Sequence, residues 1–322
     1  MHLLASLPGQ IRYHIRDFII VRWLYALKAY FCKNFTIMII INTAIELQKQ
    51  LSKSHLAPVG FVPTMGALHE GHLSLVSSAV MQCPVVVVSI FVNPTQFNDK
   101  NDLLNYPRTP KSDLSLLNGV MRESDLVFIP DVKEIYPFED KRLFHFGNLD
   151  KVMEALHRPG HFNGVAQVVS RLFEIVNPDI AFFGLKDFQQ LAVIKELVRQ
   201  TKNKVRVIGN PIIRESDGLA MSSRNVLLDP QIRSHASSIY KSISEASRMI
   251  SDHDIPEIRN AVAENINSIS GFKLEYFEIV DDTELIPVTT KDEMKKGKRY
   301  FGCIAVTAGK IRLIDNIEIG LF

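Results

Sequence analysis

Two histidines lie three residues apart within residues 61–73, where a strand-like pattern gives way to a helix-like one. The apolar run that opens this stretch enters a turn with Pro63 and Gly66, and apolar residues at helical spacing follow. The first N–H groups of a helix lack partners within the helix, and the helix dipole favours negative charge, so this junction suits a phosphate. In a first turn, His69 and His72 can point the same way. The stretch predicts a nucleotide site; the alternative is a strand-to-helix turn with two solvated histidines.

Other catalytic motifs do not fit the chain. A zinc-protease helix needs two histidines four residues apart, whereas the spacing here is three. The sequence contains neither the dinucleotide pattern G-x-G-x-x-G nor a P-loop. It also has no Gly-x-Ser-x-Gly elbow and no convincing cysteine–histidine nucleophile pair. We therefore expect neither metal ligands nor a covalent nucleophile among the site residues.

Further polar clusters follow the candidate strands. Residues 91–97 contain Gln96 and an asparagine. Their side-chain amides can both donate and accept hydrogen bonds, which suits hydroxyls and a carboxylate. The alternative is an Asn-Pro turn with a solvated glutamine. Residues 106–109 carry an arginine beside a proline and are a weak signal alone. Residues 157–164 hold two histidines and an arginine before a helix, and they fit an anion-binding loop and a helix-capping turn equally well.

The last cluster is a pair of segments, 183–190 and 218–225, that follow successive strands. Lys186 supplies a mobile positive charge and Arg224 a planar fork, and both suit phosphate oxygens. Neighbouring serines add hydroxyl donors, whereas Asp187 could equally cap the helix that follows it. Cations, amides and hydroxyls suit the positioning of a nucleotide triphosphate for in-line attack, where placement and charge neutralisation supply most of the rate.

The composition of the 322-residue chain is that of a globular protein, with 46% hydrophobic and 22% charged residues. Its length allows two domains. A net charge of +2 gives no reason to expect nucleic acid or an acidic membrane as a partner. The three cysteines lie far apart without a C-x-x-C, so neither a disulfide framework nor a zinc cluster is indicated, and a reducing cytoplasm fits.

Strands that alternate with helices predict an α/β fold. The β-branched run at residues 84–92 is typical of a strand buried on both faces of a parallel sheet. The pattern implies right-handed crossovers and a doubly wound parallel sheet, in which ligands bind beyond the carboxyl ends of the strands. The other candidate strands are residues 38–41, 59–62, 126–129, 180–183 and 205–208, and the candidate helices are 43–52, a segment from about 71, 165–176 and 188–200.

The pattern changes after about residue 211. Before it, strands alternate with helices, which predicts a catalytic domain over residues 38–211. After it, two helices precede three strands, which predicts a smaller C-terminal α+β domain over residues 212–322. The elements expected in the second domain are helices at 231–251 and 256–270 and strands at 274–280, 300–307 and 311–319, the last two joined as a hairpin at 308–310.

Residues 1–37 form an extension that is basic, poor in acids and partly amphipathic. These features fit an organelle transit peptide, a membrane-surface tether or a dispensable segment upstream of a start at Met38, which we favour. Charged residues interrupt its apolar runs, so a transmembrane span is not expected.

Taken in order, these clusters resemble the motifs of the pantothenate synthetase (pantoate–β-alanine ligase) family. Residues 63–72 are similar to its version of the HIGH motif of nucleotidylyltransferases and class I aminoacyl-tRNA synthetases. The resemblance runs from about Met38 to Phe322, and one departure is Leu185, where the family typically carries glutamate. The other matching segments are residues 91–97, 106–109, 158–164, 184–190, 221–225 and 312–316.

The resemblance implies a Rossmann-like domain with a smaller C-terminal domain, and a two-step reaction. The carboxylate of (R)-pantoate would attack the α-phosphate of ATP, with Mg²⁺ bound through the triphosphate, to give pantoyl adenylate and pyrophosphate. The amine of β-alanine would then give pantothenate and AMP. The resemblance also implies a cytoplasmic homodimer whose core binds neither nucleic acid nor membrane.

Roles for individual residues follow from the resemblance by position. Gln96 and Gln190 would hold pantoate, Gln96 would also contact β-alanine, and His72 would be the proton donor. Because an acyl adenylate hydrolyses readily, the site should exclude water, with residues 221–224 and the C-terminal domain as candidate lids. The expected catalytic residues are His69, His72, Lys186 and Arg224. The residues expected around ATP are Met65, Gly66, Ala67, Leu68, His69, Glu70, Gly71, His72, Gly184, Leu185, Lys186, Asp187, Ile213, Met221, Ser222, Ser223 and Arg224.

Two other functions share parts of the pattern. A nucleotidylyltransferase that stops at a nucleotide-coupled product would share residues 63–72 but would not need the pair Gln96 and Gln190. A catalytically silent adenine-nucleotide sensor would bind ATP without turnover, and the complete set of cations argues against it.

Overall fold

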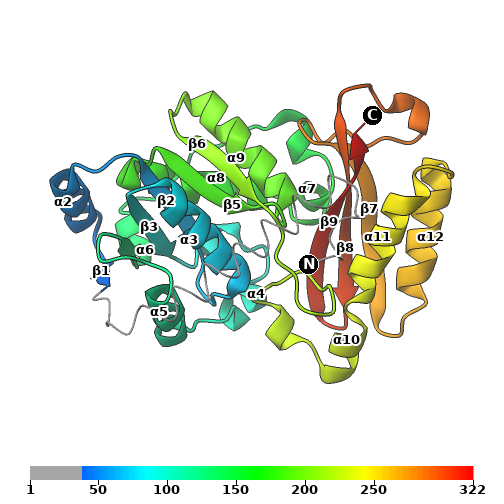
Figure 1. The fold of residues 1–322 in the computed structure, drawn as a ribbon, viewed down its shortest axis with the longest axis horizontal. Helices are drawn as coiled ribbons and strands as arrows, with labels where there is room; N and C mark the ends of the chain where they lie inside the picture. Colours follow the sequence, from blue (N-terminus) through cyan, green and yellow to red (C-terminus); the bar gives the residue numbers. More distant parts are fainter. Residues whose placement is uncertain (1–37, 322) are drawn as a thin grey trace, which may run out of the picture. The chain divides into compact units, whose positions relative to one another are not determined.

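The larger sheet is built from six parallel strands in the order β1-β4-β3-β2-β5-β6, within residues 38–321, which the computed structural model describes (Figure 1). The predicted α/β class with a doubly wound parallel sheet is confirmed. The proposals for residues 1–37 lie outside the described residues. The strands are β1 (Ile39–Ile41), β2 (Val59–Thr64), β3 (Val85–Ile90), β4 (Leu126–Phe128), β5 (Ile180–Gly184) and β6 (Arg206–Asn210).

Helices cover both faces of this sheet, because successive strand residues point to opposite faces. Phe61 of β2 is buried among residues of helices α8 and α9, whereas Val62 packs with helices α3 and α5. All six residues of β3 are buried, as its β-branched run predicts. The helices of this part are α2 (Ala44–Ser54), α3 (Glu70–Gln82), α4 (Lys100–Asn105), α5 (Pro110–Asn118), α6 (Val132–Ile135), α7 (Glu154–His157), α8 (His161–Val176) and α9 (Phe188–Thr201), with 3-10 turns η1 (Pro94–Gln96) and η2 (Gly147–Asp150).

The strand order reverses direction beside β2. From β2 the chain proceeds to β3 and β4 on one side and then crosses to β5 and β6 on the other. The carboxyl ends of β2 and β5 therefore flank the switch point, where ligands bind in open α/β sheets. The first motif follows β2 and the segment with Lys186 follows β5, so both reach this edge.

The C-terminal part contains a second, antiparallel sheet in the order β7-β8-β9. One face packs on helices α11 and α12, and the other contributes Phe301 and Cys303 to the core around α8 and α9. Its predicted strands and the β8–β9 hairpin are confirmed. The remaining elements are β7 (Phe272–Asp281), β8 (Arg299–Ala308), β9 (Ile311–Leu321), α10 (Pro230–His235), α11 (Ser238–Met249) and α12 (Ile255–Asn267), with 3-10 turns η3 (Asn225–Leu227) and η4 (Lys291–Glu293).

Two predicted helices have different limits in the structure. The helix expected at 231–251 is two helices, because the N–H groups of Ala236 and Ile239 bond to carbonyls three residues back and break the regular α pattern. The helix expected at 165–176 begins earlier, at His161, because Gly164 lets its first turn approach η1 closely.

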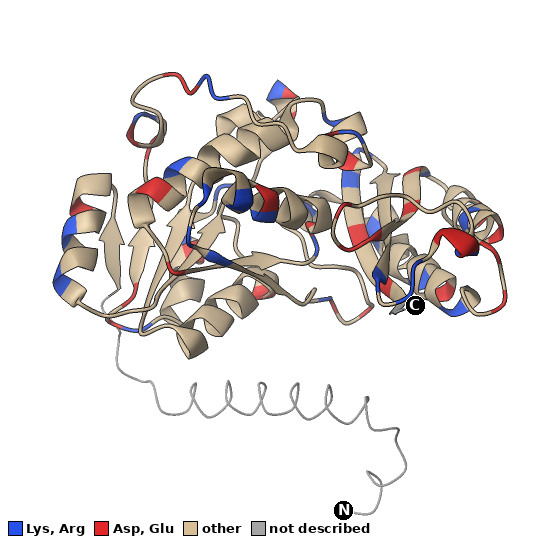
Figure 2. Cartoon of the chain, turned by 90° about the horizontal axis from the view of Figure 1, so that it is seen from above, with Lys and Arg blue, Asp and Glu red and all other residues tan. Residues whose placement is uncertain are grey.

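Basic and acidic side chains are interspersed along the described helices and loops (Figure 2), in keeping with a net charge of +2. None of the helices in the described part of the chain combines the length and apolar character that a membrane crossing requires.

Substitution of Gly164 by alanine tests the close approach of α8 to η1. A Cβ atom at Gly164 would lie 2.5 Å from the carbonyl oxygen of Thr95 and 2.8 Å from the Cα atom of Gln96. The gain in helix propensity is at most about 1 kcal/mol, whereas overpacking against backbone costs about 1–3 kcal/mol. We expect a lower free energy of unfolding in urea. Gly119→Ala is the matched control, because its Cβ would meet only the Leu116 carbonyl at 3.4 Å; equal stability of the two variants would contradict the prediction.

Candidate active site

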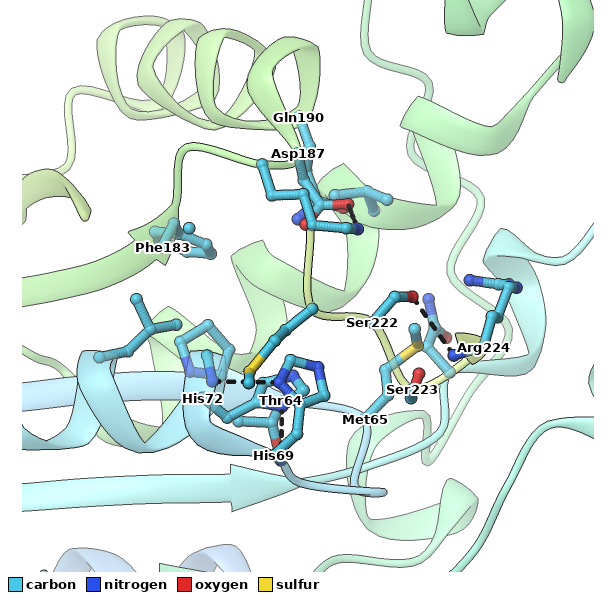
Figure 3. A pocket seen from close by; sticks show the side chains of 18 of the residues that line it. Thr64, Met65, His69, His72, Phe183, Asp187, Gln190, Ser222, Ser223 and Arg224 are labelled. Carbon is cyan, nitrogen blue, oxygen red and sulfur yellow. Dashed lines mark hydrogen bonds and ion pairs between the residues drawn. The ribbon is translucent and has the colours of Figure 1, made fainter. Parts of the chain in front are cut away.

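A pocket lies at the switch point, and its walls come from the segments that follow β2, β3, β5 and β6 and from the loop that precedes η3 (Figure 3). It brings together His69, His72, Lys186 and Arg224 with Gln96 and Gln190. The other expected residues that line it are Met65, Gly71, Gly184, Asp187, Ile213, Met221, Ser222 and Ser223. Five expected ATP residues are not among the described residues that line it: Gly66, Ala67, Leu68, Glu70 and Leu185.

The turn after β2 is held from behind by a residue that the sequence does not single out. The buried carboxylate of Asp113, on α5, accepts the backbone N–H groups of Ala67 at 3.1 Å and Leu68 at 2.8 Å. Thr109 donates its hydroxyl to the same carboxylate at 3.0 Å. These N–H groups are therefore already used within the chain, and the expected contact of Ala67 and Leu68 with ATP stays a prediction for their other atoms.

The two histidines cap the helix that carries them. Nδ1 of His69 accepts the N–H of Gly71 at 3.1 Å, and Nδ1 of His72 accepts the N–H of His69 at 3.4 Å. A neutral imidazole that accepts at Nδ1 carries its proton on Nε2, so both rings retain an N–H for an anion. Gly71 is required here, since a Cβ atom would lie 2.8 Å from Cε1 of His69. We expected the unpaired backbone N–H groups of this helix to bind the phosphate. Instead, the donors that the helix leaves available are the Nε2–H groups of the two imidazoles.

Both histidines are half-buried and neutral at pH 7. Burial and then the Lys186 ammonium lower the pKa of His69 to about 4. Burial, then His69 and Lys186, lower the pKa of His72 to about 3. The alternative of two solvated histidines is wrong.

The segment after β5 is held by the second sheet. Asn316 of β9 donates its side-chain amide to the carbonyl of Leu185 at 2.8 Å and to that of Lys186 at 3.1 Å. Asp187 occupies the N-cap position of α9, but its carboxylate caps no described N–H group of that helix and lies 4.0 Å from Nζ of Lys186. The alternative role of Asp187 as a side-chain cap is therefore wrong. The side chain of Leu185 lies beside Gly209 of β6, so this departure from the family pattern does not alter the pocket wall.

Arg224 already has an anionic partner in the described chain. Its guanidinium donates to both carboxylate oxygens of Asp102, on α4, at 3.0 and 3.2 Å. It also lies over the ring of Tyr106, 5.6 Å from the ring centre, and the Tyr106 hydroxyl is 3.3 Å from that of Ser223. The loop that carries Arg224 is thus tied to α4 across the pocket. The sequence marks Tyr106 only weakly, and it gives no signal for Asp102.

The orientation of the Gln96 amide is set by its neighbours. Asn93 donates to Oε1 of Gln96 at 3.1 Å and also to the carbonyl of Gly164, while Tyr136 donates its hydroxyl to Oδ1 of Asn93 at 3.0 Å. Because its oxygen is used, Gln96 turns its NH₂ group toward Met65, whose sulfur is 3.1 Å away.

Sequence reasoning missed the apolar wall of the pocket. In the sequence these residues have the pattern of a buried helix face or of strand ends. Their types therefore do not distinguish residues that line a pocket from residues of the hydrophobic core. The missed lining residues are Leu75, Val165, Val168, Val169, Leu172, Pro211 and Ile212, whereas Pro63, Thr64, Phe91, Asn93, Tyr106 and Phe183 also line the pocket and belong to the clusters that the sequence marks.

Comparisons with known proteins agree on one family. Residues 39–318 match the family described as pantoate-beta-alanine ligase. A pantothenate synthetase of Azobacteroides pseudotrichonymphae is 49% identical over 284 residues, which cover 87% of this chain and 99% of that protein. One from Bacteroides fragilis is 48% identical over 283 residues, with the same shares covered.

Solved structures give the same result. The pantothenate synthetase from Thermus thermophilus matches with a TM-score of 0.79 and 40% identity, covering 88% of this chain and 99% of that one. A pantoate-beta-alanine ligase from Francisella tularensis, solved in complex with beta-gamma ATP and beta-alanine, matches with a TM-score of 0.69 and 34% identity, covering 88% and 98%.

The lowered pKa of His72 predicts how stability depends on pH. Because the folded pKa of about 3 lies below the ordinary value of 6.5, the unfolded chain binds this proton more readily, and stability is lost as pH falls from about 6.5 toward 3. From pH 7 to pH 5 the free energy of unfolding should fall in both proteins. The fall should be about 1–2 kcal/mol smaller in His72→Gln than in the parent chain. Urea unfolding at both pH values measures this. His253→Gln, at an exposed position, is the control, and identical pH dependence in His72→Gln and the parent would refute the prediction.

Proposed function

Because this chain belongs to the pantoate–β-alanine ligase family, we propose that its pocket ligates pantoate to β-alanine through a pantoyl adenylate formed from ATP. The observation that carries the proposal is the convergence of the cations Lys186 and Arg224 and the paired histidines with Gln96 and Gln190 in one pocket. The first group suits a triphosphate and the amides suit a hydroxy acid. The nucleotidylyltransferase alternative has no use for the amide pair.

In the first step, an oxygen of the pantoate carboxylate forms a bond to the α-phosphorus of ATP, and the bond to the bridging oxygen of pyrophosphate breaks. Negative charge moves to the leaving pyrophosphate. Lys186 and the two Nε2–H groups of the histidines are placed to neutralise it, which is the main source of rate in phosphoryl and nucleotidyl transfer. For His72 to act as proton donor, the bound triphosphate must raise its pKa from about 3, because burial, His69 and Lys186 keep the ring neutral.

Pantoate is held by two kinds of surface. Its hydroxyls meet the NH₂ group of Gln96, which Asn93 orients, and the amide of Gln190. Its two methyl groups fit the apolar wall from α8, where Val165 and Val169 line the pocket. A hydroxy acid with a bulky apolar centre matches this combination better than a nucleoside does.

In the second step, the nitrogen of β-alanine attacks the acyl carbon, the carbon–oxygen bond to AMP breaks, and AMP leaves with the electron pair while the amine loses a proton. Water must be excluded between the steps. We propose that residues 212–322 form a lid domain over the catalytic residues 38–211 and that residues 221–224 close the mouth. In that role Arg224 exchanges Asp102 for the triphosphate.

Magnesium would enter with ATP. Asp187 carries the one carboxylate among the described residues that line the pocket, and no group of three or more metal-ligating side chains is present in residues 38–321. This donor set suits a cation whose ligands are mostly phosphate oxygens and water. We propose that Mg²⁺ is bound through the triphosphate and that Asp187 faces it or the ribose.

The family resemblance also supports a cytoplasmic homodimer. Light scattering of the purified full chain would give the assembly state, and a monomer at micromolar concentration would remove this part of the proposal.

The decisive experiment is an assay of pyrophosphate and AMP with ATP, pantoate and β-alanine, each omitted in turn. The proposed function requires pyrophosphate release that depends on pantoate and AMP release that depends on β-alanine. A nucleotidylyltransferase would release pyrophosphate without pantoate. A silent sensor would bind ATP with no turnover.

Lys186→Ala should reduce pantoate-dependent pyrophosphate release about 100- to 1,000-fold, because it removes a preorganised cation from the site of developing charge. The fold should remain intact, since Lys186 lies in a loop whose backbone is held by Asn316. Circular dichroism checks the fold, and Lys204→Ala, an exposed lysine after α9, is the control. Unchanged pyrophosphate release from a folded variant would contradict the assigned role.

A further inference from the structure

Between two residues that line the pocket, Gln96 and Tyr106, the chain leaves the pocket wall and forms a strap of residues 98–105. The strap contains the short helix α4, and none of the residues of that helix is buried. Leu104, near its end, is 73% exposed. A segment with so few buried contacts opens locally at little cost. The position of the strap therefore depends on the side chains that bind it to its neighbours.

The base of the strap is fixed. The rings of Phe97 and Tyr106 meet edge to face with their centres 5.6 Å apart, so the two ends of the strap lie side by side. Asn98 donates its side-chain amide to the carbonyl of Pro159 at 2.5 Å. A movement of the strap therefore pivots about this base and displaces mainly its middle.

The middle of the strap is tied to the loop 221–224 through one carboxylate. Both oxygens of Asp102 accept from Nη2 of Arg224, at 3.0 and 3.2 Å, so a single guanidinium nitrogen serves the whole pair. The two side chains are 39% and 26% exposed. At such exposure an ion pair shifts an equilibrium by at most about fivefold. The pair can thus bias the position of the strap and still yield to a triphosphate, which carries more charge.

The loop on the other side of this ion pair is held at both ends. Met221 donates its N–H to the carbonyl of Ile213 at 3.0 Å. Asn225 is buried, and its amide donates to Glu215 at 2.6 Å and to the carbonyl of Ala220 at 3.1 Å. The strap, rather than the loop, is therefore the partner that can move when the ion pair breaks.

Arg224 meets two anions in the course of the proposed reaction. Figure 3 shows it on the opposite side of the pocket from His69 and His72, and its guanidinium there is bound to Asp102. In the adenylation step it binds the triphosphate instead. Once pyrophosphate has left, most of that negative charge is gone, and the carboxylate of Asp102 is the nearby anion that can replace it.

We propose that Asp102 is a positioning residue that recaptures Arg224 when pyrophosphate leaves and so closes the strap over the acyl adenylate. The inference rests on the proposed function and adds a control of water access to its second step. While the strap is open, the oxygen of a water molecule attacks the acyl carbon and the water gives up a proton to the solvent. The carbon–oxygen bond to AMP breaks, AMP leaves with the electron pair, and pantoate is regenerated. Since closure is a bias of at most about fivefold, β-alanine still enters through the open state.

Asp102→Asn in the full chain tests this role, because it removes the charge and keeps the size of the side chain. The Kd for ATP, measured by calorimetry without pantoate, should fall about two- to fivefold, since ATP no longer competes with a carboxylate for Arg224. Release of AMP with ATP and pantoate but without β-alanine should rise about two- to fivefold, since water reaches the adenylate more often. General damage to the fold would weaken ATP binding, so the two changes together distinguish loss of the ion pair from a structural defect.

Asp99→Asn is the matched control. Asp99 is the exposed N-cap residue of α4, where its carboxylate accepts the N–H of Asn101 at 2.7 Å. Asparagine caps a helix as well as aspartate does, so this variant makes the same change of charge within the strap and should behave as the parent. Asp102→Glu keeps a carboxylate and should restore most of the parent's low AMP release.

Three results would overturn the inference: ATP binding in Asp102→Asn that is no tighter than in the parent, unchanged AMP release without β-alanine, or the same changes in Asp99→Asn. Tighter ATP binding alone is not enough, because Asp102 would then only compete with ATP. Failure of the proposed function looks different, since the parent chain itself would release no pantoate-dependent pyrophosphate.

Discussion

A buried ion pair between segments far apart in the sequence holds the second sheet against the catalytic part. Arg312 of β9 donates two hydrogen bonds to Glu154 of α7, and Nε of the same arginine donates to Glu275 of β7. Burial works against both charges, yet the guanidinium holds the pKa of Glu154 below its usual range. Such a pair contributes little net stability against an apolar replacement, whereas removing one partner costs about 3–5 kcal/mol. Its effect is to fix one position of the sheet, from which Asn316 reaches the loop that carries Lys186.

The same sheet also contacts the backbone of the loop that carries Lys186. Asn316 lies four residues beyond Arg312 on β9 and restrains the loop after β5, since it donates to two successive carbonyls beside Lys186. Burial lowers the pKa of both histidines, and the ammonium of Lys186 lowers it further. The pocket therefore sets the Lys186 ammonium beside two neutral imidazoles. In the proposed function, the negative charge of a triphosphate would raise the pKa of both rings, so nucleotide binding and histidine protonation would be coupled.

Much of this could be predicted from local patterns. The β-branched run of β3 indicates a doubly buried strand, and alternation of strands with helices indicates a parallel sheet with its site at the carboxyl edge. The residues that hold the site in shape could not be predicted. In the sequence, nothing distinguishes Asp113 and Asp102 from acidic residues of an ordinary protein surface. The partners Glu154 and Arg312 are separated by 158 positions. No periodicity links such residues, because only the folded topology brings them together.

Two helix starts show how binding and capping compete for the same side chains. An aspartate at an N-cap is strongly preferred, and its hydrogen bond contributes about 1 kcal/mol. Asp187 occupies that position on α9, yet its carboxylate lies beside Lys186 and bonds to no described N–H group of the helix. On α3, His69 and His72 do both tasks, since an imidazole accepts from the helix with one nitrogen and donates outward with the other. A carboxylate has no donor to offer an anion, whereas a capping histidine does. This difference fits the proposed roles, in which the imidazoles of α3 face the triphosphate and Asp187, free of capping, faces Mg²⁺ or a hydroxyl.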